Sequence, residues 1–497
     1  MDRNSEQAVS DVRLGAPVVY ERSIGDTWDP AWAADGRLYT PGNDGSGWDG
    51  GCSSNVFFST LAGDDPASLA GANVNCMTEY GGWAKAGFDE CTWKSAGCLS
   101  LDGALYLSVA RHRYGRLPGD PHGRQIAERA SIIMSSDSGR TWSRPERDNY
   151  LSAMWPGRRF ATHYFVHYGR DGAAPDRDNA RTYVYAVSNN GFWCNGDDYV
   201  LGRIRRDRMD RLDPADWQYY RGVDGMLDSA WTANLEEARP VISSPLQCGE
   251  TGPTYLVDAG RYVLVAWYYP GDPNVDTDRT HFAFYEAPAP WGPWTRFGET
   301  VNWPVGWYCP RVLSRWQRRD GDELHAVIAT GGDYWQAEHY KLTLVPVALK
   351  LGGSFAPSNP EPLPLVVNDD QTGAGPNRIE YTGDWEHERA RFRAHNRDEH
   401  HSSSTGAGFR IAFDGSRIRW YGSKQASCGI AAVSIDAGSE VEVDCHTHSP
   451  STQFERLLYD SGVLPRGSHL FSVQVTGRGN EYAKGTRIFS DRIEIFP

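Results

Sequence analysis

The chain has 497 residues, a formal net charge of -14 and a sequence pI near 5.5. An acidic chain without a long basic run argues against nucleic-acid binding and against attachment to an anionic membrane by charge. Aromatic residues make up 12% of the chain, and the 53 glycines and 29 prolines are typical of a turn-rich all-β protein.

No stretch of the sequence approaches the roughly 20 apolar residues that span a bilayer. The first residues are polar and contain no apolar signal core. From the nature of the domains described below, we expect a secreted or periplasmic protein whose signal peptide is not part of this sequence. The nine cysteines are odd in number and include no CxxC pair, so we expect no zinc cluster. For an exported protein we expect one or more disulfides, for example Cys428 with Cys445.

Residues 17–350 contain a recurring unit of about four short strands, repeated roughly every 60 to 90 residues. Five units can be distinguished, and a count of six or seven would require splitting the segments 171–181 and 209–245. Each unit can bury its faces only against its neighbours, so a closed ring follows. The sequence therefore predicts an all-β, five-bladed β-propeller. The units begin near Thr27, Thr92, Arg158, Cys248 and Tyr308.

Turn signals recur at fixed places in these units. Asp35-Gly36 in the first unit corresponds to Asp102-Gly103 in the second. The stretch "SSDSGRTW", residues 135–142, is similar to the Asp-box of sialidases and other propellers, a resemblance that makes Asp137 a hairpin cap and lets Trp142 pack between blades. Asp and Ser side chains satisfy turn N–H groups, and Gly supplies the turn geometry. We therefore interpret Asp137 as structural.

The composition changes after Lys350. Residues 351–365 form a linker rich in Pro, Gly and Ser. Residues 366–497 alternate short strands with Asp-Gly and Pro-x-Gly turns, which predicts a β-sandwich. This region resembles the accessory jelly-roll domain at the ends of many bacterial carbohydrate-active enzymes, which implies glycan contact or structural support.

Candidate catalytic residues follow from the geometry of a propeller. The first strand of each blade lines the central channel, so residues near the starts of these strands converge at one mouth. Two carboxylates with cationic or titratable partners suit acid–base work in a partly desolvated pocket. The five positions are Asp29, Lys94, His163, Glu250 and Arg311.

The opening segment "GDTW…DG.LY" resembles that of five-bladed glycoside hydrolases, including an uncharacterised-domain type that contains endo-D-arabinanases. The resemblance implies that Asp29, which precedes Pro30, is the general base or nucleophile and that Glu250, shortly before Gly252-Pro253, is the proton donor. Two departures stand against the second assignment, because Thr251 intervenes and the unit is the fourth rather than the third. Both acids could instead be turn residues, and Asp26 competes with Asp29.

Other residues of the mouth would hold the sugar. Tryptophans could stack on sugar faces, and lysine or arginine could fix hydroxyl or carboxylate groups. His163 is either a packed channel histidine or a third catalytic residue that transfers protons. The residues predicted to bind substrate are Asp26, Trp28, Trp32, Lys94, His112, Arg159, Tyr164, Trp193 and Arg311.

The leading hypothesis is a glycoside hydrolase that cleaves a plant or microbial polysaccharide or oligosaccharide with a pair of carboxylates. The first alternative is a polysaccharide lyase on the same ring that acts on a rhamnose–glucuronate linkage with His, Tyr and Arg or Lys. The second is a non-catalytic glycan-binding protein. No nucleotide loop, HExxH helix or G-x-S-x-G elbow is present in the sequence. We expect no catalytic metal or cofactor; a structural Ca²⁺ on the channel axis would be compatible with such propellers.

Overall fold

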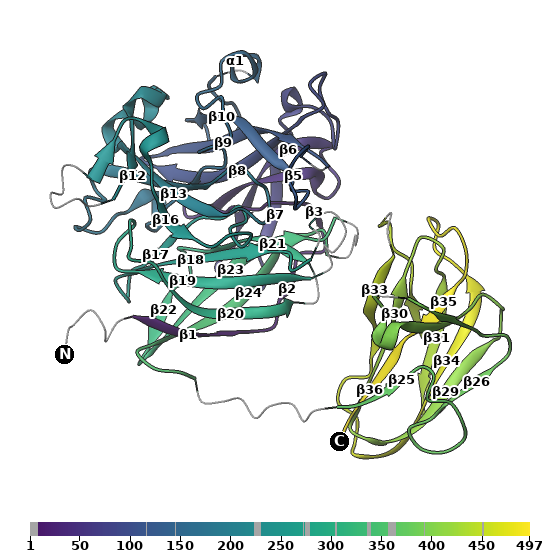
Figure 1. Cartoon of the computed structure of the whole chain (residues 1–497). Coiled ribbons are helices and arrows are strands. Elements are labelled where there is room, and N and C mark those ends of the chain that lie inside the picture. Colours follow the sequence, from purple (N-terminus) through teal and green to yellow (C-terminus); the bar gives the residue numbers. More distant parts are fainter. Residues whose placement is uncertain are drawn as a thin grey trace. The chain divides into compact units, whose positions relative to one another are not determined.

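The computed structural model divides into two compact units, Met1–Ala356 and Pro357–Pro497 (Figure 1). It describes residues 8–115, 117–144, 146–222, 230–271, 273, 279–303, 306–334, 339–355, 364–391, 393–449 and 452–497. The boundary falls within the predicted linker 351–365, of which residues 356–363 lie outside the described residues. Within the described ranges, no helix combines the length and apolar character needed to cross a membrane.

Antiparallel sheets make up the first unit, and the described residues form five of them. The first sheet contains β3 (Ser23–Asp26), β4 (Ala31–Trp32), β5 (Leu38–Trp48), β6 (Ser54–Ala62) and β7 (Ala70–Asn75). The second contains β8 (Thr92–Leu101), β9 (Ala104–Arg113) and β10 (Ile126–Ser135). The third contains β11 (Tyr164–Phe165), β12 (Tyr183–Asn189), β13 (Asp198–Arg205), β14 (Trp217–Tyr220), β15 (Trp231–Thr232) and β16 (Pro240–Ser243).

The chain's two ends meet in the last sheet of this unit. The fourth sheet contains β17 (Thr254–Leu256), β18 (Arg261–Tyr268), β19 (Thr280–Ala287) and β20 (Thr295–Trp303). The fifth contains β1 (Val9–Leu14), β2 (Val18–Val19), β21 (Trp307–Val312), β22 (Arg318–Asp320), β23 (Glu323–Gly332) and β24 (Thr343–Leu351). Figure 1 shows β1 in purple beside the green strands of this sheet, where it pairs with β24. The unit therefore begins before the predicted start at residue 17.

Hydrogen bonds near the inner strands join each sheet to the next. Asn43 and Ser95 link the first two sheets, His167 Nε2 lies 2.7 Å from the Cys98 carbonyl between the second and third, and the His167 N–H donates to Pro253 toward the fourth. The Thr254 hydroxyl donates to the Val312 carbonyl of the fifth sheet, and the Tyr308 hydroxyl donates to Asp26 of the first. These links run from the first sheet back to the first, which is the closure that a propeller requires. The prediction of an all-β propeller is confirmed. The described residues of this unit form five sheets, in agreement with five blades, but the number of blades stays a prediction.

The turns predicted at Asp35-Gly36, Asp102-Gly103 and Asp137 are present in the structure. Gly36 and Gly103 have φ angles of 87° and 80°, in the region that glycine adopts most readily. The Asp137 carboxylate accepts hydrogen bonds from the Thr141 N–H at 2.9 Å and from the Ser135 hydroxyl at 2.8 Å. Trp142 packs edge-on against Phe58 of the first sheet, with ring centroids 4.9 Å apart. Asp137 therefore caps a turn, and Trp142 joins two sheets.

Helices are few and short. The only α-helix within the described residues is α1 (Glu146–Leu151), which protrudes from the first unit in Figure 1. The 3-10 turns are η1 (Thr78–Tyr80), η2 (Arg170–Gly172), η3 (Arg206–Arg211), η4 (Pro214–Asp216), η6 (Leu235–Glu237) and η7 (His395–Arg397).

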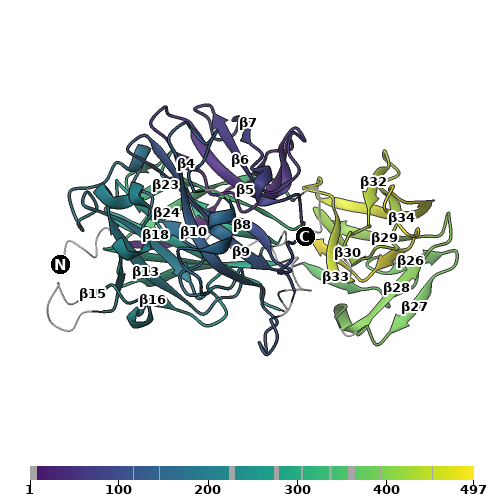
Figure 2. The same cartoon turned by 90° about the horizontal axis from the view of Figure 1, so that it is seen from above.

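The second unit is a β-sandwich (Figure 2). One sheet contains β25 (Leu365–Asn368), β36 (Arg492–Phe496), β30 (Arg417–Lys424) and β33 (Gln453–Asp460). The facing sheet contains β26 (Ile379–Thr382), β29 (Gly408–Gly415), β34 (Gly467–Arg478), β31 (Ile430–Ile435) and β32 (Val441–Asp444), and a small third sheet contains β27 (Glu386–Arg389), β28 (Asp398–Ser402) and β35 (Ile488–Ser490). Trp420 of the first sheet meets Phe409 and Phe471 of the second in a buried core.

A disulfide is present, as expected, but not between the two cysteines given as the example. Cys52 and Cys76 are bonded within the first sheet's loops. Cys428 and Cys445, the pair suggested by sequence, are both buried free thiols. Both thiols lie in the buried core of the second unit. A free cysteine packs there as a small apolar residue, so its presence in the core needs no covalent link.

Candidate active site

A cavity of about 410 Å³ opens where the sheets of the first unit meet. Each of the five sheets, or a loop that follows one of its strands, contributes to the wall, which places the cavity at the mouth of the propeller channel. The lining residues are Asp26, Thr27, Asp44, Ala84, Lys94, His112, Tyr114, Gly115, Gln125, Trp193, Tyr269, Pro273, Tyr308, Asp333 and Tyr334.

Two aspartates lie side by side in this wall. Asp26 ends β3 and pairs in register with Asn43 of β5, so Asp44 is its neighbour on the adjacent strand. The backbone is left-handed at Thr27 and Asp44, with φ angles of 56° and 44°. Left-handed non-glycine residues are uncommon and gather at functional sites. This irregular backbone presents both carboxyl groups to the same cavity.

Asp26 is buried and surrounded by hydroxyl groups. The Tyr308 hydroxyl donates to Asp26 Oδ2 at 2.7 Å, the Tyr340 hydroxyl at 2.9 Å, and the Thr27 hydroxyl donates to Oδ1 at 2.6 Å. Burial raises the pKa of Asp26 to about 6; the Asp44 charge adds to the rise, while Lys94 and the hydroxyl donors oppose it. Asp26 therefore holds its proton in mildly acidic solution.

Asp44 is also buried, but it is paired with a lysine. Its Oδ2 forms an ion pair with Lys94 and accepts a hydrogen bond from the Tyr114 hydroxyl. Asn43 fixes this geometry, because its side chain donates to the Ser95 carbonyl at 3.0 Å and accepts from the Ser95 N–H at 2.9 Å. The two strands are thus held in the register that brings Lys94 to Asp44. Asp44 Oδ1 has no hydrogen-bond partner among the described residues.

Aromatic rings form much of the remaining wall. Trp193 meets Tyr308 edge-on at 4.8 Å and lies 6.3 Å from Tyr269, centroid to centroid. His112 Nε2 is 2.8 Å from the Gln125 side-chain oxygen. Burial, followed by the nearby Lys94 charge, lowers the pKa of His112 to about 4, so this imidazole is neutral near neutral pH.

Asp29 lies elsewhere, in the interior of the channel. It is 1% exposed, forms an ion pair with Arg311 at 3.2 Å and accepts a hydrogen bond from the Cys98 N–H at 2.7 Å. Arg311 is equally buried and donates to the Phe165 carbonyl. Neither residue is among the residues that line the cavity, and each is the other's charge partner. The Arg311 guanidinium also places a positive charge in the interior of the channel. This is the region in which a structural Ca²⁺ on the channel axis would be compatible with such propellers.

Glu250 and Tyr164 are buried near the cavity without lining it. Glu250 is 5% exposed, and burial raises its pKa well above the ordinary value; Asp26 adds to the rise, while Lys94 and the Tyr164 phenol oppose it. The Glu250 N–H donates to the Trp193 carbonyl at 3.1 Å. Glu250 therefore supports the segment that carries Trp193 and is electrostatically coupled to Asp26.

The remaining predicted residues are not part of the cavity wall. His163 is fully buried, hydrogen-bonds the Ser108 hydroxyl and packs against Trp155 at 4.2 Å. Trp28 is buried against Phe57. Arg159 donates to the Ala238 carbonyl, and Trp32 lines a different cavity beside Arg315 and the Asp35-Gly36 turn. The cavity brings together four of the predicted residues: Asp26, Lys94, His112 and Trp193.

Sequence reasoning missed Asp44 and the tyrosines that surround Asp26. Asp44 follows "YTPGN", which reads as a turn, yet all eleven residues of β5 are buried. Tyr308 stands at the start of the fifth unit, and Asp26 directly precedes the start of the first, so both lie where a unit begins. Attention to that equivalence would have found Tyr308, whereas Tyr340 gives no local signal.

One cluster in the second unit has metal-ligand chemistry. Carboxylate oxygens of Asp369, Asp370 and Asp398 lie within 4.8 Å of one another. His400 Nδ1 is 2.7 Å from Asp369 and His387 Nε2 is 2.9 Å from Asp398. Asp369 and Asp398 thus each have a histidine partner, and Asp370 is exposed.

Comparison with known proteins identifies the family. Residues 21–340, well over half of the chain, match the model described as "Domain of unknown function (DUF4185)", and the chain belongs to this family. A region of 131 residues is 30% identical to an A type blood alpha-D-galactosamine galactosaminidase of Flavonifractor plautii. That match covers 24% of this chain and 11% of the length of that relative.

Distant structural similarities also exist. An exo-beta-1,3-galactanase from Phanerochaete chrysosporium has a TM-score of 0.43 and 8% identity over 97% of this chain and 100% of that one. A xylan beta-1,4-xylosidase from Bacillus halodurans has a TM-score of 0.37 and 10% identity over 97% of each chain.

Proposed function

We propose that the first unit is a glycoside hydrolase whose catalytic carboxyl groups belong to Asp26 and Asp44. The observation that carries the proposal is their placement on neighbouring strands at one cavity, with Asp26 buried among hydroxyl groups and Asp44 paired with Lys94. Most glycosidases use one carboxylic acid to protonate the leaving oxygen and a second carboxylate to activate water or attack the anomeric carbon. Residues that divide these two roles are recognised by environments that push their proton affinities apart.

The environments assign the roles. Asp26, with a pKa raised to about 6, is the proton donor. Asp44, which forms an ion pair with Lys94, is assigned the role of the carboxylate that activates water or attacks the anomeric carbon. This assignment replaces the pair Asp29 and Glu250, because Asp29 is engaged with Arg311 inside the channel.

The charge of the cavity favours a neutral or amino sugar. Three aspartates, Asp26, Asp44 and Asp333, stand in the described wall against one lysine, Lys94, which is itself paired with Asp44. The described lining offers an anionic uronate no arginine and no lysine other than the one paired with Asp44, so the lyase alternative has less support. The aromatic wall of Trp193, Tyr269 and Tyr308 suits the apolar faces of sugar rings. The galactosaminidase named above acts, by its name, on a sugar of this kind.

The protein's place of action is also a proposal. The disulfide between Cys52 and Cys76 supports work outside the reducing cytosol. Together with the predicted sugar substrate, it favours a secreted or periplasmic enzyme.

The test is release of reducing ends from a panel of neutral, amino and uronate-containing glycans by the full chain. Asp26→Asn and Asp44→Asn should each lower turnover by at least about 10²-fold, the scale of acid–base assistance. Asp35→Asn is the matched control, because Asp35 lies in the same sheet but caps a turn, and its rate should be near wild type. Ultraviolet absorbance from an unsaturated uronate product would instead identify a lyase. Binding without any cleavage would favour the glycan-binding alternative.

A further inference from the structure

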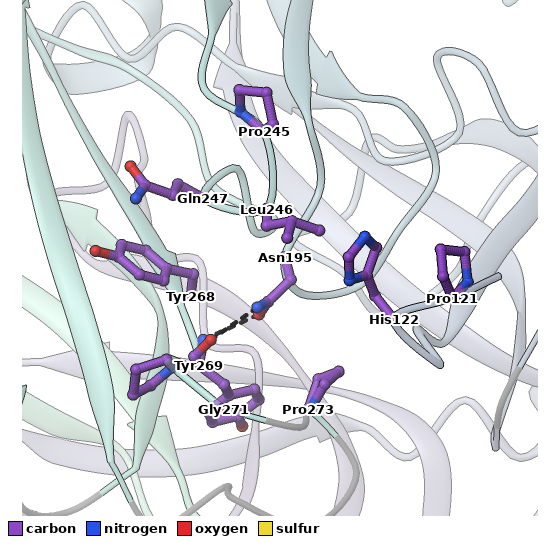
Figure 3. A pocket seen from close by; sticks show the side chains of 11 residues that line it. Pro121, His122, Asn195, Pro245, Leu246, Gln247, Tyr268, Tyr269, Gly271 and Pro273 are labelled. Carbon is purple, nitrogen blue, oxygen red and sulfur yellow. Dashed lines mark hydrogen bonds between the residues drawn. The ribbon is translucent and has the colours of Figure 1, made fainter.

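A second cavity, of about 480 Å³, adjoins the candidate active site (Figure 3). Tyr269 and Pro273 line both cavities. The second cavity is bordered by the loops that carry Pro121 and His122, Asn195, and Pro245 to Gln247, and by Tyr268 at the end of β18. A molecule bound in the catalytic cavity would therefore reach the second cavity by passing Tyr269.

Hydrogen bonds and ring contacts hold the wall that the two cavities share. The Tyr269 N–H donates to Asn195 Oδ1 at 2.9 Å, and Asn195 Nδ2 donates back to the Tyr269 carbonyl at 2.8 Å, the contact drawn in Figure 3. Asn195 itself is left-handed, with a φ angle of 51°, and 6% exposed. The Tyr269 ring is held against Trp267 at 5.4 Å, centroid to centroid. These contacts fix the boundary between the cavities.

The second cavity has the chemistry of a neutral sugar site. Its described lining includes no aspartate, glutamate, lysine or arginine, unlike the catalytic cavity. Gln247 Oε1 accepts hydrogen bonds from Ser244 at 2.8 Å and from Arg296 at 3.2 Å, which orients the amide and leaves its Nε2 as a donor. The Tyr268 hydroxyl is anchored by Glu299, so its ring is fixed in the wall. Fixed rings and oriented amides are the usual partners of sugar faces and hydroxyls.

We infer that the second cavity is a subsite that binds a neutral sugar unit of the same glycan chain, beyond the unit held at Asp26 and Asp44. The inference rests on the proposed function and narrows its substrate to a chain long enough to pass Tyr269. Binding energy gained away from the bond that breaks raises kcat/KM for long substrates only.

Variants of Gln247 and Tyr268 test this subsite. For long oligosaccharides, Gln247→Ala and Tyr268→Ala should lower kcat/KM about threefold to tenfold, the equivalent of one lost hydrogen bond or ring contact. For the shortest substrate that is cleaved, both variants should match wild type. Tyr482→Ala is the control, because Tyr482 is an exposed tyrosine of the second unit. Gln247→Ala leaves no gap in an apolar core, so it keeps the test valid if Tyr268→Ala folds poorly.

Calorimetric binding of the same oligosaccharides to Asp26→Asn separates this inference from the proposed function. If affinity rises with chain length and Gln247→Ala removes that rise, the subsite is supported, even if wild type cleaves none of the glycans. If wild type cleaves glycans but affinity and kcat/KM show no length dependence that Gln247→Ala alters, the subsite is refuted while the hydrolase stands. An equal loss at every chain length would also refute it.

Discussion

Replacing Asp26 with asparagine should make the first unit inactive and, at alkaline pH, more stable than wild type. The fold raises the pKa of Asp26 from 3.8 to about 6, chiefly by burial. Folding therefore favours the protonated form, and this contribution to stability is complete below about pH 4 and is lost as the pH rises through 6. Asparagine has no proton to lose and can still hydrogen-bond Tyr308 and Tyr340.

The pKa shift sets the size of the effect. A rise of this amount corresponds to about 3 kcal/mol between the two protonation states. For a unit of about 350 residues, that free energy is equivalent to about 4 °C in Tm. The difference in Tm between Asp26→Asn and wild type should therefore grow by about 4 °C between pH 4 and pH 8.

Scanning calorimetry at both pH values, with turnover measured in parallel, checks this reasoning. Asp35→Asn, a change in a partly exposed turn of the same sheet, should show neither the pH-dependent gain nor the loss of turnover. A difference in Tm that is the same at pH 4 and pH 8 would refute the perturbed carboxyl group. Normal turnover in Asp26→Asn would refute its catalytic role.

Three further outcomes are expected. In wild type, kcat/KM should fall as the pH rises above about 6, because Asp26 must be protonated to act as an acid, and a profile flat to pH 8 would contradict this. Asp29→Ala should lower the free energy of unfolding by about 3–5 kcal/mol, because it leaves Arg311 buried and unpaired; a large loss of turnover with an unchanged Tm would give Asp29 the catalytic role instead. Removing the disulfide with Cys52→Ser and Cys76→Ser should cost about 3.5 kcal/mol, given their separation of 24 residues, and an unchanged Tm would show that the link adds nothing.

The sequence predicts the scaffold better than the site. Strand and turn patterns are local, so Asp35-Gly36, Asp102-Gly103 and the Asp137 box could be recognised directly. The composition change after Lys350 likewise located the second unit. The first strand, β1, escaped notice because its partner β24 lies at the other end of the unit, more than 300 residues away.

Which residues form the site depends on how deep in the channel each side chain lies. The sequence around a residue does not reveal that depth. Asp26 and Asp29 are three residues apart, yet one borders the cavity and the other pairs with Arg311 in the interior. The register of β3 against β5 and the left-handed backbone at Thr27 and Asp44 decide which acid faces the cavity. The resemblance of the opening segment selects Asp29 over Asp26, because the sequence alone does not reveal which of the two pairs with Arg311.

The most direct measurement of the central claim is product release from neutral and amino glycans by wild type, Asp26→Asn and Asp44→Asn under the same conditions, at about pH 5. The account predicts new reducing ends with wild type, no unsaturated product, and a loss of at least about 10²-fold in each variant. Wild-type rates in both variants, or an unsaturated product, would contradict it.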